Sequence, residues 1–200
     1  MLGLTYMRSI KSIERYFFGR LSELESLAKR GDPWVFLCAS SYIEYLMKIV
    51  LGRSGDQEDY KNFLLNYFFK ACSKYAAYRF SFGTNDLHVQ MYHVLRCGIV
   101  HSFSLIPDPK ARRKGGRYRS ILLAHQGQGY EHLQPVIRNR MRPKIDSVVF
   151  VAQDFVGDLK EATNYVFRET RKREPAAKQI RDNMLNWFKE YPPIGIKMIE

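Results

Sequence analysis

The sequence predicts a mainly α-helical protein: an up-and-down helical bundle with a small basic, partly β insert after the fourth helix. Three observations predict this fold. Apolar residues recur at helical spacing, glycine and proline separate these segments, and cationic residues concentrate between positions 104 and 144. The chain has 200 residues, 46% of them apolar, which suits one domain with a core of its own. We therefore expect a single domain over residues 1–200, with the insert at about 104–150.

The first half of the chain predicts one helix after another. Over residues 5–29 apolar side chains recur at steps of three and four and form one face. Asp32-Pro33 predicts the cap and first turn of a second helix, which runs to about Val50 and is apolar nearly all round, as is typical of a central helix. A third helix is expected over about 58–78, where the many aromatic rings suit a core better than a base-stacking surface.

Three further helices are expected in the rest of the chain. One covers about 86–103 and is closed by Pro107. Another covers about 152–171, and the last begins at Pro175 and stops before Pro192. No repeat of fixed period is present, which excludes a solenoid.

The segment between the fourth and fifth helices is strongly basic. The formal net charge of the chain is +12, and residues 104–144 hold ten cationic residues against two acidic ones. Such a local patch favours a polyanionic partner, RNA above all, although a solvated loop has the same composition. Residues 118–125 and 130–136 predict a small hairpin, and 145–150 a short strand. The candidates for phosphate contacts are Lys110, Arg112, Arg113, Lys114, Arg117 and Arg119.

Several classes of protein do not fit the sequence. Charged residues interrupt every apolar run too soon for a membrane span, and no signal peptide is evident, so we expect a cytoplasmic protein. The cysteines Cys38, Cys72 and Cys97 form no C-x-x-C pair, which argues against disulfides or structural zinc, and we expect all three to be reduced and buried. We expect neither metal nor cofactor.

The fourth predicted helix is apolar on two opposite faces. The bundle can cover one face, and a second copy of the same helix is the most economical cover for the other, because two-fold homodimers are the commonest oligomers. Gly98 is consistent with close approach of another backbone, since glycine within a helix costs roughly 1 kcal/mol relative to alanine. One face holds Leu87, Met91, Val94, Leu95 and Gly98; the other holds Val89, Tyr92, Arg96, Val100 and Phe103.

Arg96 and His101 are the candidate working pair on this helix. In an α-helix, residues five apart lie about 140° apart around the axis, so these two side chains do not meet within one helix. Across a two-fold contact, however, both pairs can face one shared cleft. The sequence therefore predicts a site that exists only in the dimer.

Residues 95–102, Leu-Arg-Cys-Gly-Ile-Val-His-Ser, resemble the Arg-x(4–6)-His motif of HEPN proteins, a helical superfamily of prokaryotic toxin, CRISPR-associated and antiphage ribonucleases. The resemblance covers about twelve residues. It implies a HEPN-like bundle that pairs through this helix, metal-independent cleavage of RNA, a role as a toxin or antiphage effector, and an antitoxin protein as a partner. Histidine exchanges protons near neutral pH and arginine offers several donors to a phosphate, so His101 would be the acid/base and Arg96 the phosphate clamp.

Three further residues are candidates for support of this site. Glu44 lies in an apolar run and must pair if it is buried, with Arg96 as a possible partner; otherwise it faces solvent. His93 either borders the cleft or is a core histidine. Cys97 stands where many HEPN proteins carry a polar residue, which favours the alternative of a non-catalytic HEPN module that binds RNA or a nucleotide, or only dimerises. A DNA-binding regulator that uses the basic insert is a third hypothesis.

Overall fold

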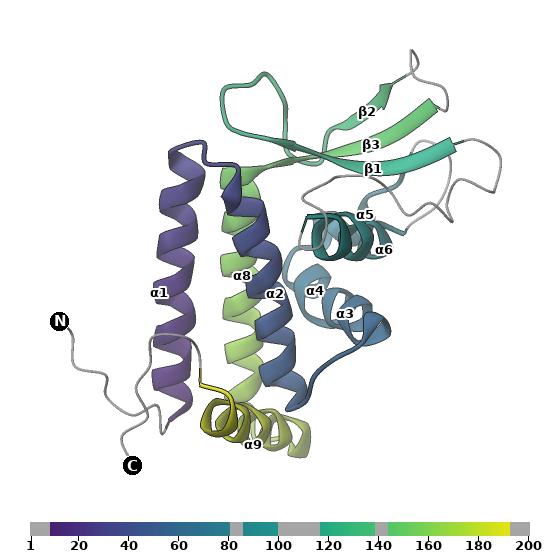
Figure 1. Ribbon diagram of the computed structural model, residues 1–200. Helices are drawn as coiled ribbons and strands as arrows, with labels where there is room; N and C mark the ends of the chain where they lie inside the picture. The colour runs from purple at the N-terminus through teal and green to yellow at the C-terminus, as the bar shows by residue number, and fades with distance from the viewer. Residues whose placement is uncertain (1–8, 81–85, 100–116, 139–143, 193–200) are drawn as a thin grey trace.

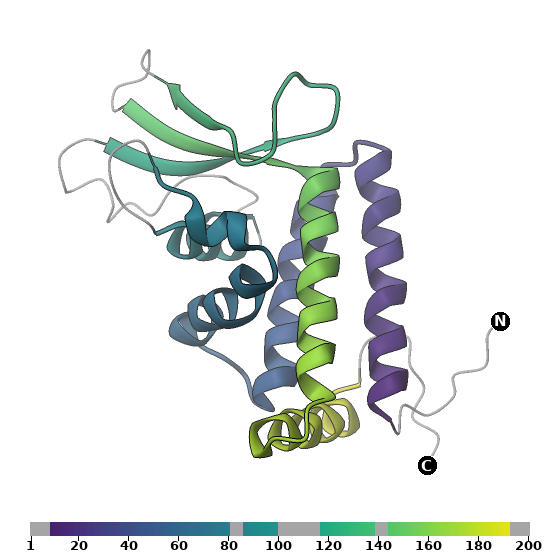
Figure 2. The ribbon, with the colours of Figure 1, turned by 180° about the vertical axis from the view of Figure 1, so that it is seen from behind.

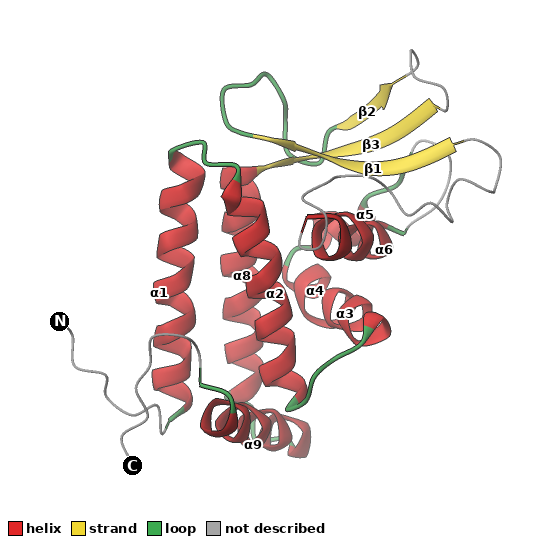
Figure 3. Cartoon of the chain, viewed as in Figure 1, coloured by secondary structure: helices red, strands yellow, loops and turns green. Residues whose placement is uncertain are grey.

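The computed structural model describes residues 9–80, 86–99, 117–138 and 144–192. It is mainly helical, as predicted, with a three-stranded sheet across one end of the helices (Figure 1; Figure 3). Helices α1 (Ile10–Lys29), α2 (Trp34–Leu51) and α8 (Ala152–Thr170) run side by side, and α9 (Pro175–Glu190) crosses their far end (Figure 1; Figure 2). These four helices confirm the predicted first, second, fifth and sixth helices.

The ends of these helices follow from local sequence. Ser9 is extended, with φ −141°, and its hydroxyl accepts the backbone N–H of Ser12 at 3.2 Å, so α1 begins at Ile10 and not at the predicted residue 5. The carboxylate of Asp32 accepts the backbone N–H of Trp34 at 2.9 Å, as expected of a cap. Helix α2 is the one helix within the described ranges that is long and apolar enough to cross a bilayer, and 56% of it is buried inside the protein, as in a core helix.

The predicted third helix is not one continuous α-helix. It consists of α3 (Gln57–Phe63), a π-helical segment η1 (Leu64–Phe68), α4 (Phe69–Ala71) and α5 (Ser73–Ala77). The burial pattern explains the π segment, because the buried residues recur at a spacing of five, which i→i+5 hydrogen bonds bring to one side. These residues are Phe63, Leu64, Phe68 and Phe69.

The predicted fourth helix is also partly π-helical. It comprises α6 (Leu87–Gln90) and the π-helical segment η2 (Met91–Ile99), which pack against α2 and α3; residues 100–103 lie outside the described ranges. One predicted apolar face is confirmed as core, since its described side chains are fully buried. They are Leu87, Met91, Val94 and Leu95.

The predicted hairpin is wrong. Strands β1 (Arg117–Ala124) and β2 (Pro135–Arg138) do not pair with each other; the order is β1-β3-β2, with β3 (Lys144–Val151) in the centre. Strand β1 runs parallel to β3, with Ile121 opposite Val148, and β2 runs antiparallel to it. The physical reason is the burial of β3: residues 146–151 are buried, so the backbone N–H and C=O groups on both edges of the strand need partners within the protein, and one hairpin partner could serve only one edge. The predicted short strand at 145–150 is thus confirmed, and it is the central strand of the sheet.

The sheet is part of the main core. Ile121, Val148 and Phe150 face the helices and belong to the same apolar cluster as α1, α2 and α8. Val151 ends β3 and is also the residue that precedes the first turn of α8, so strand and helix follow one another without a loop. The segment after the fourth helix therefore contributes to the main core, and the other face of the sheet forms a smaller apolar cluster around Val149.

A buried carboxylate joins the sheet to the helices. The hydroxyl of Tyr75 on α5 donates to Oδ2 of Asp158 on α8 at 2.7 Å, and Nε2 of His132 lies 3.1 Å from the same oxygen. Lys74 Nζ lies 2.8 Å from Oδ1 of Asp158. Because Nδ1 of His132 accepts the backbone N–H of Val151 at 3.0 Å, the ring carries its proton on Nε2. Burial alone raises the pKa of Asp158, but hydrogen bonds from His132, Lys74 and Tyr75 outweigh it and hold the pKa below its ordinary value.

Replacement of this carboxylate is expected to destabilise the protein in a pH-dependent manner. Because the pKa of Asp158 is lower in the folded than in the unfolded state, its contribution is fully present above the unfolded pKa of about 3.9 and is lost as pH falls through the folded value. Asp158→Asn should reduce the free energy of unfolding by about 2 kcal/mol at pH 7, measured with urea, and by less at pH 3. Asp182→Asn, at an exposed acid on α9, is the control and should have little effect. An equal loss at both pH values would contradict the role of this carboxylate.

Candidate functional site

Arg96 forms a bidentate ion pair with Glu44 of α2. Nε of Arg96 lies 2.6 Å from Oε2 of Glu44, and Nη2 donates to Oε1 at 3.1 Å. Lys48, one turn further along α2, lies 2.8 Å from the same Oε1. The side chains of Arg96 and Glu44 are 23% and 16% exposed, so the pair is shielded from most of the solvent. Of the two alternatives for Glu44, the structure therefore has the ion pair with Arg96 and not the solvent-facing edge.

A small cavity of about 80 Å³ opens beside this ion pair. It has room for a few water molecules or one small polar group, and not for a whole nucleotide. Two phenol rings approach it, from Tyr60 on α3 and Tyr92 on η2. Burial raises the pKa of Tyr60, and burial together with a hydrogen bond to Cys97 raises the pKa of Tyr92 to about 12. Both hydroxyls therefore stay protonated at neutral pH.

The segment that carries Arg96 does not have the α-helical geometry that the sequence predicts. The separation of about 140° holds for an α-helix. From Met91 to Ile99 the helix instead has π geometry, in which i→i+5 hydrogen bonds bring residues five apart toward one side. The α-helical angle is therefore wrong for the described part of this helix. His101 itself lies outside the described residues.

The other candidate support residues lie close to Tyr92. Cys97 is half-buried and interacts with the Tyr92 hydroxyl, and the ring of His93 meets the ring of Tyr92 edge-on at 5.2 Å between centroids. Val89, Tyr92 and Arg96, which belong to the second apolar face, are only partly buried in the single chain. This face is therefore less covered than the one that packs into the bundle.

Of the six candidate phosphate contacts, the structure describes the side chain of Arg119 alone. Its guanidinium forms an ion pair with Asp86 at the start of α6 and lies 5.9 Å above the ring of Phe80. Arg119 thus ties β1 to the helices. The side chain of Arg117, at the first position of β1, is not described, and the remaining four residues lie outside the described ranges: Lys110, Arg112, Arg113 and Lys114.

The cysteines do not all behave as expected. Cys72 is buried, and burial raises the pKa of its thiol to about 12. Cys97 is half-buried. Cys38 is exposed on α2, so the expectation that all three are buried is wrong for this residue. Helix α2 is apolar nearly all round, yet it lies at the side of the bundle at this position.

Sequence reasoning missed three residues around Arg96: Lys48, Tyr60 and Tyr92. Lys48 had a visible signal, because Glu44 and Lys48 have the i,i+4 spacing of a helical ion pair. Tyr60 and Tyr92 fit the apolar faces of their helices and gave no sign that they flank a polar cavity. Their ring centroids lie 5.6 Å apart, which brings α3 and η2 together beside the ion pair.

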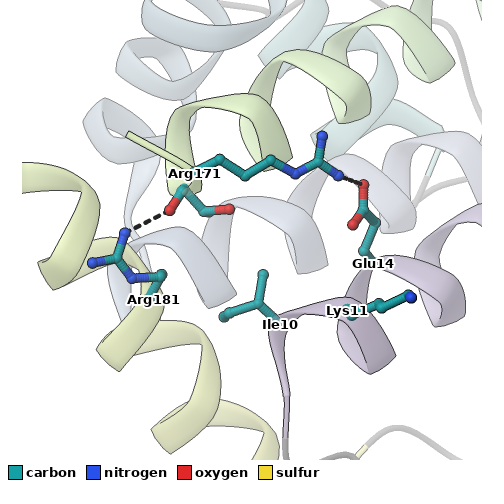
Figure 4. Close-up of a pocket in the computed structure, with 6 residues that line it drawn as sticks. Ile10, Lys11, Glu14, Arg171 and Arg181 are labelled. Atoms are coloured by element: carbon teal, nitrogen blue, oxygen red, sulfur yellow. Dashed lines mark hydrogen bonds and ion pairs between the residues drawn. The ribbon is translucent and has the colours of Figure 1, made fainter. Parts of the chain in front are cut away.

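A larger cavity, of about 490 Å³, lies between the start of α1, the end of α8 and α9 (Figure 4). Its cationic side chains have structural partners. Arg171 reaches across to Glu14 of α1, with Nη2 2.5 Å from Oε1, and Arg181 of α9 donates to the carbonyl of Thr170 at 2.6 Å and so caps α8 (Figure 4). These arginines hold α1, α8 and α9 together.

No family model, no curated protein and no solved structure matches this chain. Within the described ranges, no cluster of three or more histidine, cysteine, aspartate or glutamate side chains is placed to hold a metal ion.

Glu44 is expected to matter more for stability than either of its cationic partners. Removal of its charge leaves Arg96 and Lys48 facing each other in a partly buried position, whereas loss of one cation leaves Glu44 with the other. Glu44→Gln should lower the free energy of unfolding by about 1–2 kcal/mol, and Lys48→Met by clearly less, as measured by urea unfolding. If Lys48→Met lowered the free energy of unfolding more than Glu44→Gln, the central role of Glu44 among these three charges would be refuted.

Proposed function

We propose that this protein is a metal-independent endoribonuclease of HEPN type that acts as a cytoplasmic homodimer, as a toxin or antiphage effector. The observation that supports this most directly is the placement of Arg96. Its guanidinium is partly buried on a π-helical segment, borders a small polar cavity, and precedes His101 by five residues. π-Helical segments occur often at functional sites, where they place side chains that an α-helix would direct elsewhere.

The proposed chemistry requires only these residue types. The 2′-oxygen of a ribose attacks the adjacent phosphorus, a base takes the 2′-hydroxyl proton, and an acid gives a proton to the leaving 5′-oxygen. The products are a 2′,3′-cyclic phosphate and a 5′-hydroxyl. In a dimer, His101 of one protomer is both the base and the acid, since the proton it takes from the 2′-hydroxyl can pass to the leaving 5′-oxygen, and Arg96 stabilises the additional negative charge on the phosphate.

Glu44 has a positioning role in this proposal. Its two oxygens hold Nε and Nη2 of Arg96, which fixes the plane of the guanidinium before RNA arrives. A phosphate presents oxygens of the same geometry and competes with this carboxylate for the same donors. Lys48 remains beside Glu44 and balances its charge when Arg96 turns to the phosphate.

One observation favours the alternative of a non-catalytic HEPN module that binds RNA or a nucleotide, or only dimerises. Arg96 already has a bidentate partner within its own chain, as structural arginines do. Under this alternative the ion pair fastens η2 to α2, and RNA binds through the basic residues between 104 and 144 without being cut.

Cleavage of RNA in the presence of EDTA is the decisive test. Wild-type protein should cut single-stranded RNA to products with 2′,3′-cyclic phosphate ends, whereas Arg96→Ala and His101→Ala should lose at least about 100-fold in rate, as expected for removal of a catalytic group. His88→Ala, on the same helix, is the matched control and should retain activity. If pure wild-type protein binds RNA and leaves it intact, the non-catalytic alternative holds.

The shared cleft can be tested by mixing the two inactive variants. If the arginine of one protomer works with the histidine of its partner, a mixed dimer of Arg96→Ala and His101→Ala contains one complete site. Equal mixing after dissociation should then restore about a quarter of the wild-type rate. Activity that stays at the background of the separate variants, while mass measurements show mixed dimers, would exclude this arrangement of the cleft.

A further inference from the structure

A second groove lies between the α3–η1 segment and α8, with a volume of about 360 Å³. This volume lies within the usual range of small-molecule sites, about 300–1,000 Å³. Aromatic rings and carboxamides dominate its walls, together with a carboxylate. The residues that matter for the argument are Asn62, Phe63, Asn66, Tyr67, Tyr165 and Glu169.

The aromatic rings form a continuous surface in this groove. Phe63 and Tyr67 are stacked, with centroids 5.1 Å apart and an interplanar angle of 24°, and Tyr67 meets Tyr165 of α8 edge-on at 6.4 Å. Tyr67 and Tyr165 are only partly buried, so part of each ring remains open to a ligand, although the guanidinium of Arg168 lies over one face of Tyr165, 5.0 Å from its centroid. Burial and the nearby Glu169 raise the pKa of Tyr67, and its hydroxyl is therefore a hydrogen-bond donor at neutral pH. Open aromatic rings of this kind are suited to stacking against a flat heterocycle.

The carboxamides supply a polar edge beside the rings. The side chains of Asn62 and Asn66 are exposed and line the groove, and neither amide makes a hydrogen bond to any residue that the structure describes. Each amide offers donors and an acceptor in one plane, the pattern that pairs with the edge of adenine. Asn66 and Tyr67 lie on the π-helical segment η1.

The charges in the groove are already balanced. Glu169 lies 2.6 Å from Lys172, and Asp59 lies 2.7 Å from Arg53. Lys70 also lines the groove. The two carboxylates therefore have cations of their own, and a further cation would meet Lys70. These charges favour a neutral, flat ligand with a polar edge over a free cation or an isolated phosphate.

We propose that this groove binds a nucleobase, adenine above all, with its ring against Tyr67 and Tyr165 and its edge on Asn62 and Asn66. None of the residues that line this groove also lines the cavity at Arg96, so the two sites are distinct. The proposal of a nucleobase site does not depend on whether the protein cleaves RNA. A base from an RNA strand and a free nucleoside offer the same chemistry to the groove.

Binding of ribonucleosides to the full-length protein tests the proposal without a cleavable phosphodiester. Adenosine and adenosine 5′-monophosphate should bind with similar affinity in calorimetry or ligand-observed NMR, and ribose 5-phosphate should not bind. An oligoadenylate that binds much more tightly than adenosine, and equally depends on Asn66, identifies an RNA strand as the source of the base; equal affinities identify the free nucleoside. Failure of RNA cleavage would leave these results unchanged, so the two proposals fail separately.

Variants locate the bound base. Asn66→Ala should weaken adenosine binding about tenfold, and Tyr67→Leu by at least as much, because stacking on one ring contributes about 1–3 kcal/mol per base, which corresponds to about 5- to 150-fold. Tyr67→Phe keeps the ring and should retain most of the affinity. Asn186→Ala, at an exposed asparagine on α9 outside the groove, should bind as the wild type does.

Three outcomes would overturn the proposal. The first is that no ribonucleoside binds at millimolar concentration. The second is that ribose 5-phosphate binds as well as adenosine 5′-monophosphate, which would make phosphate the recognised group. The third is that tetramethylammonium competes with adenosine, which would indicate an aromatic site for cations. Circular dichroism of each variant confirms that a lost affinity does not reflect a lost fold.

Discussion

The carboxylate of Asp158 is the point at which the parts of this fold meet. Its Oδ2 accepts a hydrogen bond from Tyr75 on α5 and also contacts Nε2 of His132, which lies in the connection between β1 and β2. The other ring nitrogen of His132 accepts the backbone N–H of Val151 at the end of β3. Leu133, which follows His132 in the chain, has a positive φ of 62°, an unfavourable conformation for a residue other than glycine. Its backbone N–H donates to the carbonyl of Val149 in the sheet. Such strain persists only where neighbouring contacts hold the backbone, and here the buried histidine is such a contact.

The sequence predicted those parts of the fold whose pattern is local. Helix α1 could be predicted because Phe17, Leu21, Leu24 and Ala28 repeat at mixed steps of four and three, the period of an α-helix. The π-helical segments could not, since the residues of η1 and η2 also fit an α-helix, and their geometry depends on which of them the rest of the core buries. The pairing of β1 and β2 with β3 could not be predicted either, because it depends on residues far apart in the sequence, and an apparent turn between the two outer strands favoured the simpler hairpin.

The candidate site was predictable to the extent that burial constrains charge. A buried glutamate in an apolar helix needs a cation, and this reasoning offered Arg96 as a possible partner of Glu44, beside the alternative of a solvent-facing edge; the ion pair corresponds to the first of these. The same reasoning could not place Tyr60 and Tyr92, because a tyrosine satisfies an apolar pattern whether or not its hydroxyl faces a polar cavity. The two π-helical segments each bring a polar side chain to a cavity, Arg96 in one and Asn66 in the other, so departures from α geometry coincide with the places where this fold can meet a ligand.

The strand order has a consequence for biosynthesis. The central strand β3 leaves the ribosome after both of its neighbours, and β1 precedes the end of β3 by fewer than thirty residues, a length that translation adds in about one to five seconds. During that interval the two outer strands lack their only shared partner, and the hairpin between them is the competing structure. Because β3 continues directly into α8, the strand that pairs with both β1 and β2 is joined without a loop to the helix that packs against α1 and α2.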